Sequence, residues 1–200
     1  MSPLTRTVTI LTLAAATGAC SLGGLLGGGK PPTTLRTLES QAPDPGAITR
    51  TANAGQAVTI AVPVLPKELR TVRVPVQLTP TNVQYVTDFQ WVDTPDKLFQ
   101  NLLGETVRRT TRRVVLDPNQ TGLDPGLVLS GQLSRFGYDA RTGRVEVVFD
   151  GSLAATGGAQ VETRRFTASV PADGTSATVG SALNSAANQV ALQVAGWIGG

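Results

Sequence analysis

The stretch NVQYVTDFQWVDTPDKLFQNLLGETVRRTTRR, residues 82–113, has the pattern of a strand followed by a helix. Its first part is rich in β-branched and aromatic residues, which favour a half-buried strand, and this part closes at Trp91. Thr94 can cap a first helical turn, Pro95 suits the first helical position, and Asp96 faces the positive end of the helix dipole. We therefore expect a helix that begins at Pro95.

This predicted helix has one apolar stripe and one basic end. At 3.6 residues per turn a single face carries Leu98, Phe99, Leu102, Leu103 and Val107. The last turns carry Arg108, Arg109, Arg112 and Arg113, where cations complement the negative end of the helix. The same arginines are able to bind an acidic group, so the cluster is either a solvated helix end or an anion-binding surface.

Residues 1–19 have the pattern of an export signal, and they end in the small residue Ala19 immediately before Cys20. Their apolar run is shorter than the roughly 20 residues that a membrane-spanning helix needs. The pattern resembles a bacterial lipoprotein signal, although Thr17 stands where that signal prefers leucine. The resemblance implies cleavage between Ala19 and Cys20 and a palmitate-type lipid on Cys20. Ser21 after the cysteine implies sorting to the outer membrane, with the protein on its periplasmic face.

We expect three segments in the chain. Residues 1–19 form the signal peptide, and residues 20–34 form a lipidated tether whose glycines and prolines are typical of a flexible linker with a stiffer end. Residues 35–200 form a single domain, a size that is usual for one domain. Without the signal peptide the chain has 16 basic and 14 acidic residues, so its excess charge is too small to indicate a nucleic-acid partner.

Alternation of apolar residues predicts an antiparallel meander over residues 127–138, 144–155 and 160–170. Shorter extended segments are expected at 35–38, 57–64, 67–78 and 114–116, and a second amphipathic helix at 178–198. Because both helices and the sheet have one apolar face, we expect an α+β fold. In detail we expect a two-layer sandwich, with a mostly antiparallel sheet and the two helices on one face.

The chain lacks the residues for most enzyme chemistry. It has no histidine and its single cysteine is Cys20, which excludes histidine-based triads, the usual zinc sites and an internal disulfide. The carboxylate pairs Asp88 with Asp93 and Glu146 with Asp150 are interpreted as solvated surface rather than as glycosidase-type acids. We expect no enzyme activity, no metal and no cofactor.

Several short motifs occur in an order that resembles the ABC-type transport auxiliary lipoprotein family. They are the lipoprotein cysteine, the strand Val58–Pro63, the segment Arg73–Val76, Tyr85, and Trp91 followed by the Asp93-Thr94-Pro95 helix start. The resemblance implies an outer-membrane lipoprotein that works with an MCE-domain protein, an ABC permease and an ATPase in lipid transport across the periplasm. It is also compatible with a homo-oligomer.

Two functions from different classes remain open. One is a non-enzymatic adaptor that docks the transporter to the outer membrane, with Tyr85, Trp91 and the arginines as candidate contacts, although core packing competes with exposure for Trp91. The other is a lipoprotein that assists outer-membrane assembly or binds an anionic cell-wall polymer through its arginine cluster.

Overall fold

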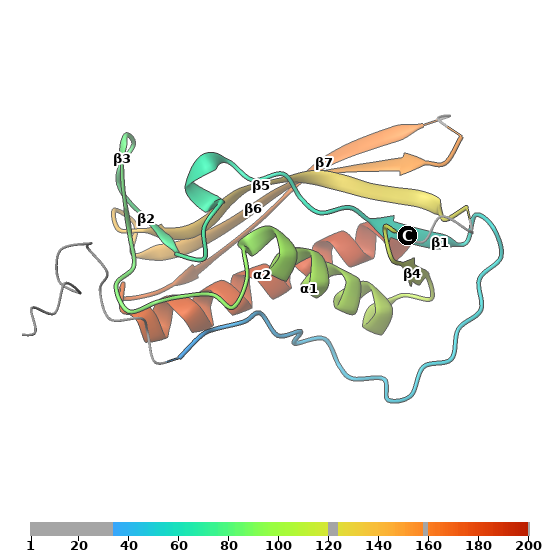
Figure 1. Cartoon of the computed structure of the whole chain (residues 1–200), viewed down its shortest axis with the longest axis horizontal. Helices are drawn as coiled ribbons and strands as arrows, with labels where there is room; N and C mark the ends of the chain where they lie inside the picture. The colour runs from blue at the N-terminus through green and yellow to red at the C-terminus, as the bar shows by residue number, and fades with distance from the viewer. Residues whose placement is uncertain (1–33, 120–123, 158–159, 200) are drawn as a thin grey trace, which may run out of the picture. The chain divides into compact units, whose positions relative to one another are not determined.

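The computed structural model describes residues 34–119, 124–157 and 160–199, and within them it shows an α+β fold (Figure 1). The described elements are β1 (Ala57–Ile60), a 3-10 turn (Lys67–Leu69), β2 (Pro75–Thr79), β3 (Asn82–Tyr85), α1 (Pro95–Thr110), β4 (Val114–Leu116), β5 (Gly126–Asp139), β6 (Arg144–Ala155), β7 (Val161–Pro171) and α2 (Ser176–Gly199). The predicted fold class is therefore confirmed.

Strand β5 is the centre of a curled, mixed sheet. It pairs with β6 in antiparallel fashion along one edge, and β6 pairs with β7 in the same way. Along its other edge β5 runs parallel to β1 at one end and to β2 at the other. β1 also runs parallel to β4, and α1 lies in the chain between them, as a parallel connection requires. The expected mostly antiparallel sandwich is not confirmed in that detail, because three of the six pairings between described strands are parallel.

The β5–β6–β7 meander was the strongest strand signal in the sequence, and the structure confirms it. Along β6 the side chains of Val145, Val147 and Phe149 are buried, as their alternation predicts. Gly131 of β5 lies opposite Gly151 of β6, and the Phe149 ring occupies the space above them. A Cβ atom at Gly131 would come within 2.8 Å of that ring, so glycine is required there.

Helix α1 begins at Pro95 as predicted, with Thr94 in the N-cap position. The Thr94 hydroxyl makes no capping bond to the helix, since it donates instead to the carboxylate of Asp93 at 3.4 Å. The predicted apolar stripe is confirmed in full, because its five members, Leu98, Phe99, Leu102, Leu103 and Val107, are all buried.

Helix α2 packs against β5, β6 and β7 and also against α1, and Figure 1 shows both helices on the same side of the sheet. A row of aromatic contacts joins the layers: Phe99 of α1 meets Phe149 at 5.4 Å between ring centroids, Phe149 stacks on Phe166, and Phe166 meets Trp197 of α2 at 5.3 Å. Neither described helix is long and apolar enough to cross a membrane.

The peripheral strands are shorter than the sequence indicated. β3 ends at Tyr85 rather than at Trp91, which makes only an isolated bridge to Arg36. That bridge also replaces the strand expected at 35–38. β1 ends at Ile60 because Pro63 and Pro66 interrupt the ladder, and only Val64 forms a further bridge, to Gln132.

Replacement of a buried stripe residue of α1 tests this packing. We predict that Leu102→Asp lowers the free energy of unfolding by about 3–5 kcal/mol or prevents folding, because it buries an unpaired charge. The control is Asn101→Asp at the neighbouring, exposed position, which should change the free energy of unfolding by less than about 0.5 kcal/mol. Urea unfolding measures both, and equal effects would show that α1 is packed on another face.

Acid stability follows from four aspartates. Hydrogen bonds from Thr178 and Thr175 lower the pKa of Asp173 to about 2. A hydrogen bond also lowers the pKa of three other aspartates: from Thr156 to Asp124, from Arg141 to Asp139, and from Arg165 to Asp150. A carboxyl group whose pKa is lower in the folded state stabilises that state above its unfolded pKa, near 3.9, and this stabilisation is lost as the pH falls. We therefore predict that the urea midpoint holds down to about pH 5 and drops between about pH 5 and 2. Asp173→Asn should reduce that drop, and an unchanged drop would contradict the assignment.

Candidate functional site

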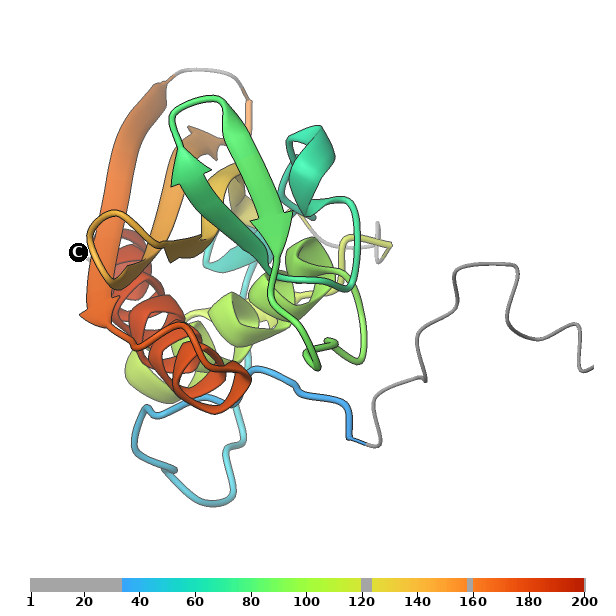
Figure 2. The ribbon, with the colours of Figure 1, turned by 90° about the vertical axis from the view of Figure 1, so that its left-hand side faces the viewer.

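The segment that follows the expected tether is fastened to both helices. We name residues 35–42 the strap. It passes the helices on the side away from the sheet (Figures 1 and 2). The strap begins with a bridge in which Arg36 N–H donates to Gln90 O at 2.9 Å and Val92 N–H donates to Arg36 O at 2.8 Å. The Arg36 guanidinium also lies over the Phe89 ring, 5.4 Å from its centroid.

Two asparagines of α2 hold the middle of the strap. Asn188, which is only 2% exposed, accepts a hydrogen bond from Gln41 N–H at 2.7 Å and donates one to Glu39 O at 2.8 Å. One turn earlier, Asn184 accepts a hydrogen bond from Glu39 N–H at 2.8 Å. A primary amide carries both a hydrogen-bond donor and an acceptor. Asn188 therefore pairs with a backbone N–H and a backbone C=O of the extended strap, as a neighbouring strand would.

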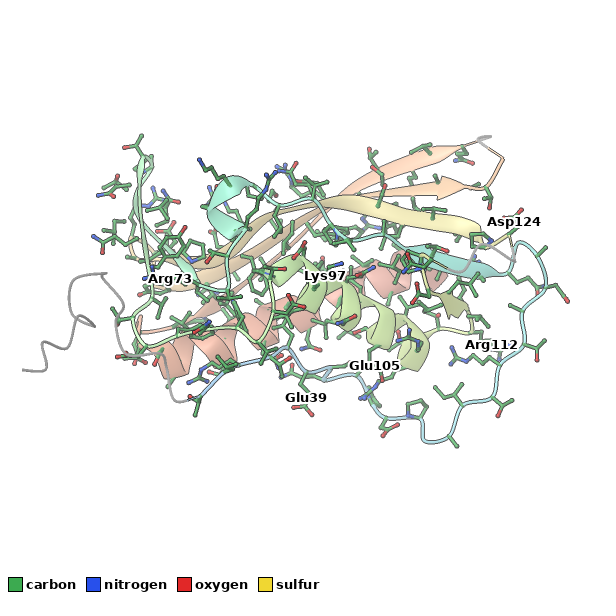
Figure 3. The ribbon with its side chains drawn as sticks, viewed as in Figure 1. Glu39, Arg73, Lys97, Glu105, Arg112 and Asp124 are labelled. Atoms are coloured by element: carbon green, nitrogen blue, oxygen red, sulfur yellow. The ribbon has the colours of Figure 1, made fainter. Side chains whose placement is uncertain are left out.

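Helix α1 holds the far end of the strap. Arg109 donates from Nη1 to Ala42 O at 2.9 Å, and Ala42 itself is buried. Arg109 also donates to Glu105 at 2.6 Å, and this hydrogen bond raises the arginine's pKa. Figure 3 shows Glu39 and Glu105 on this side of the molecule. The strap is therefore part of the folded domain rather than a continuation of the tether.

The four predicted arginines do not form one cluster. Arg109 is committed to the strap, and Arg108 forms an exposed ion pair with Glu105 at 3.5 Å. Arg113 donates to the carbonyl of Ile198 at 2.9 Å, near the end of α2. Arg112 is exposed and makes no hydrogen bond or ion pair within the described part of the chain. The anion-binding potential is therefore confined to the end of α1 that carries Arg112 and Arg113.

The two aromatic candidates differ in exposure. Trp91 is 1% exposed and packs between Phe89 and Phe136, at 4.7 and 5.8 Å between ring centroids. It belongs to the core, as the packing interpretation required, and offers no surface to a partner. Tyr85 is half-buried, donates to Glu68 O at 3.3 Å and lies beneath the Arg73 guanidinium, 4.6 Å from its centroid.

Two of the four carboxylates that a hydrolase would use, Glu146 and Asp150, are bound to arginines instead. Glu146 pairs with Arg135 at 2.9 Å, and Asp150 pairs with Arg165 at 2.5 Å while accepting a hydrogen bond from Ser134. The Arg165 hydrogen bond lowers the pKa of Asp150, which keeps that carboxyl ionised rather than available as an acid. Across the described residues there is no group of three or more side chains able to hold a metal ion.

Sequence reasoning missed the asparagines that hold the strap. Asn184 and Asn188 are polar residues, which an amphipathic pattern assigns to the solvent side of α2, whereas Asn188 is buried. Their spacing of four residues beside an apolar stripe was the available signal, since such residues lie one above the other on a helix. Cys20 and Ala19, the expected lipidation and cleavage sites, lie outside the described residues.

The protein is therefore an α+β domain in which side chains of both helices hold an N-terminal segment, the strap, by hydrogen bonds. A family model described as the ABC-type transport auxiliary lipoprotein component matches residues 37–195. The match covers most of the chain, so the chain belongs to this family. It begins within the strap, which supports the strap as part of the family's domain.

Solved structures with a similar fold are only distantly related in sequence. Protein XCC0632 from Xanthomonas campestris matches with a TM-score of 0.69 and 18% identity, over 83% of this chain and 95% of its own. An uncharacterised protein matches with a TM-score of 0.62 and 14% identity, over 75% and 96% of the two chains. A PelC dodecamer from Paraburkholderia phytofirmans matches with a TM-score of 0.41 and 17% identity, over 72% of this chain and 91% of its own. That TM-score is too low to bear on how this chain assembles. No protein of curated function matches.

Removal of the Asn188 amide tests the strap. We predict that Asn188→Ala lowers the free energy of unfolding by about 1–3 kcal/mol, because Gln41 N–H and Glu39 O lose their partner. Trypsin should also cleave after Arg36 faster than in the wild type.

The exposed Gln189→Ala, one residue away, is the matched control and should leave both quantities unchanged. If Asn188→Ala left the cleavage rate after Arg36 at its wild-type value, the asparagine would not be what holds the strap.

Proposed function

We propose that this protein is the outer-membrane lipoprotein component of an ABC transporter of the MCE type. It is anchored through a lipid on Cys20, faces the periplasm, and docks an MCE-domain protein, a permease and an ATPase for lipid transport between the membranes. The observation that carries the proposal is the family match over residues 37–195, which follows a lone cysteine placed as in a lipoprotein signal.

The strap supports this role by a physical argument. Residues 20–34 reach at most about 50 Å when fully extended, and the strap then fixes the tether's end to α1 and α2. A domain held in this way can engage a transporter while its lipid stays in the outer membrane. Such an adaptor acts through surface contacts and needs no catalytic group.

The alternative, a lipoprotein that binds anionic polymer through the arginine cluster, finds less support. Arg108 and Arg109 are paired with Glu105, and Arg109 also holds the strap, so this part of the cluster is not a free basic surface. Exposed arginines in ion pairs add little further attraction for a polymer.

Affinity purification of the full chain from detergent-extracted membranes tests the proposal. We expect mass spectrometry to find an acylated Cys20 on the bait, together with an MCE-domain protein and an ABC ATPase. Cys20→Ala should move the protein from the membrane fraction to the soluble periplasmic fraction, because the lipid supplies the attachment.

A Cys20→Ala protein that stays in the membrane fraction would refute the anchor. An acylated bait that brings down outer-membrane or cell-wall assembly proteins, without a transporter component, would refute the transport role and favour the alternative.

A further inference from the structure

A groove of about 870 Å3 lies where the end of α1, the C-terminal turns of α2 and the loop around Thr51 meet. One part of its lining is polar and includes Arg112 and Arg113. Another part is apolar and is formed by Leu192 and Ala195 of α2. Figure 3 shows Arg112 between the last turn of α1 and that loop. The volume lies in the range of pockets that hold one small ligand.

Two arginines, Arg112 and Arg113, line the polar end. Arg50 is not among the lining residues, but it donates from Nη1 to the backbone carbonyl of Arg113 at 3.2 Å, so its guanidinium lies next to that end. None of these three takes part in an ion pair with another described residue. The groove lies at the C-terminal ends of α1 and α2, each of which carries about −0.5 charge, and carbonyl groups accept from Arg50 and Arg113. These partial charges offset only part of the charge of the three arginines, so the net charge there stays positive.

The apolar end is open to a ligand. Leu192 is 45% exposed although it belongs to a helix whose other large apolar residues are mostly buried. Gly196, one turn further on the helix, has no atom within 4 Å of the position that a Cβ would take. Together they form an uncovered apolar wall beside the arginines.

We propose that this groove binds a phosphate-bearing amphiphile, namely the headgroup region of an anionic phospholipid. The phosphate lies at Arg112 and Arg113, which line the groove and whose planar guanidinium groups match phosphate oxygens in geometry and charge. The glycerol and the first acyl carbons lie against Leu192 and Gly196. The inference rests on this groove alone and does not require the proposed transport partners.

Native mass spectrometry of the full-length protein, released from detergent micelles, tests the site with three probes. These are phosphatidylglycerol, diacylglycerol with the same chains, and glycerol phosphate. We expect one phosphatidylglycerol to bind with an apparent Kd at least about tenfold lower than that of either fragment, because each fragment keeps only one half of the contacts.

Variants distinguish lipid binding in this groove from lipid binding elsewhere on the surface. Arg112→Gln should weaken phosphatidylglycerol binding about tenfold, since it removes a charged donor to phosphate. Arg164→Gln, an exposed arginine of β7 that lies over Phe166, is the matched control and should bind as the wild type does. Leu192→Gln should weaken binding of phosphatidylglycerol and leave binding of glycerol phosphate unchanged.

Three results would overturn the inference. Equal affinity for phosphatidylglycerol and diacylglycerol would show that phosphate is not recognised. Equal affinity for phosphatidylglycerol and glycerol phosphate would show that the apolar wall is not used. Equal weakening by Arg112→Gln and Arg164→Gln would place binding outside the groove.

Discussion

Helix α2 buries one face against β5, β6 and β7 and presents another face to α1 and the strap. Trp197 of α2 contacts Phe166 on the sheet, Phe166 stacks on Phe149, and Phe149 in turn contacts Phe99 of α1. The Gly131–Gly151 pair leaves the room that the Phe149 ring occupies. If α2 were displaced, α1 would lose its packing surface and the strap would lose its hydrogen bonds to the asparagines. Arg113 would also lose its hydrogen bond to the carbonyl of Ile198. The fold and both candidate surfaces therefore depend on this one helix.

The strap is fastened to the helices by side chains. Its backbone is satisfied by side chains of α2 and α1 rather than by a neighbouring strand. In the described residues the surface includes a groove with an exposed arginine and an exposed leucine at the C-terminal end of the helices.

Much of the fold could be predicted from the sequence because local patterns determine it. The start of α1 at Pro95, the buried stripe from Leu98 to Val107, the β5–β7 meander and α2 all follow from residue periodicity. The parallel pairing of β5 with β1 and β2 could not be predicted, since it joins segments far apart in the chain and depends on the crossover through α1. The roles of Asn188, Arg50 and Arg113 were hidden for the same reason, because each contacts a residue distant in sequence.

Direct contact with a transporter is the central claim, and photocrosslinking in living cells tests it most directly. A photoreactive residue in place of the exposed Arg108 on α1 reports on the helical side, and one in place of the exposed Thr163 on β7 reports on the edge of the sheet. The account predicts a crosslink from the helical position to an MCE-domain protein or another component of an ABC transporter. Crosslinks only to cell-wall or outer-membrane assembly proteins, or none from either position, would contradict it.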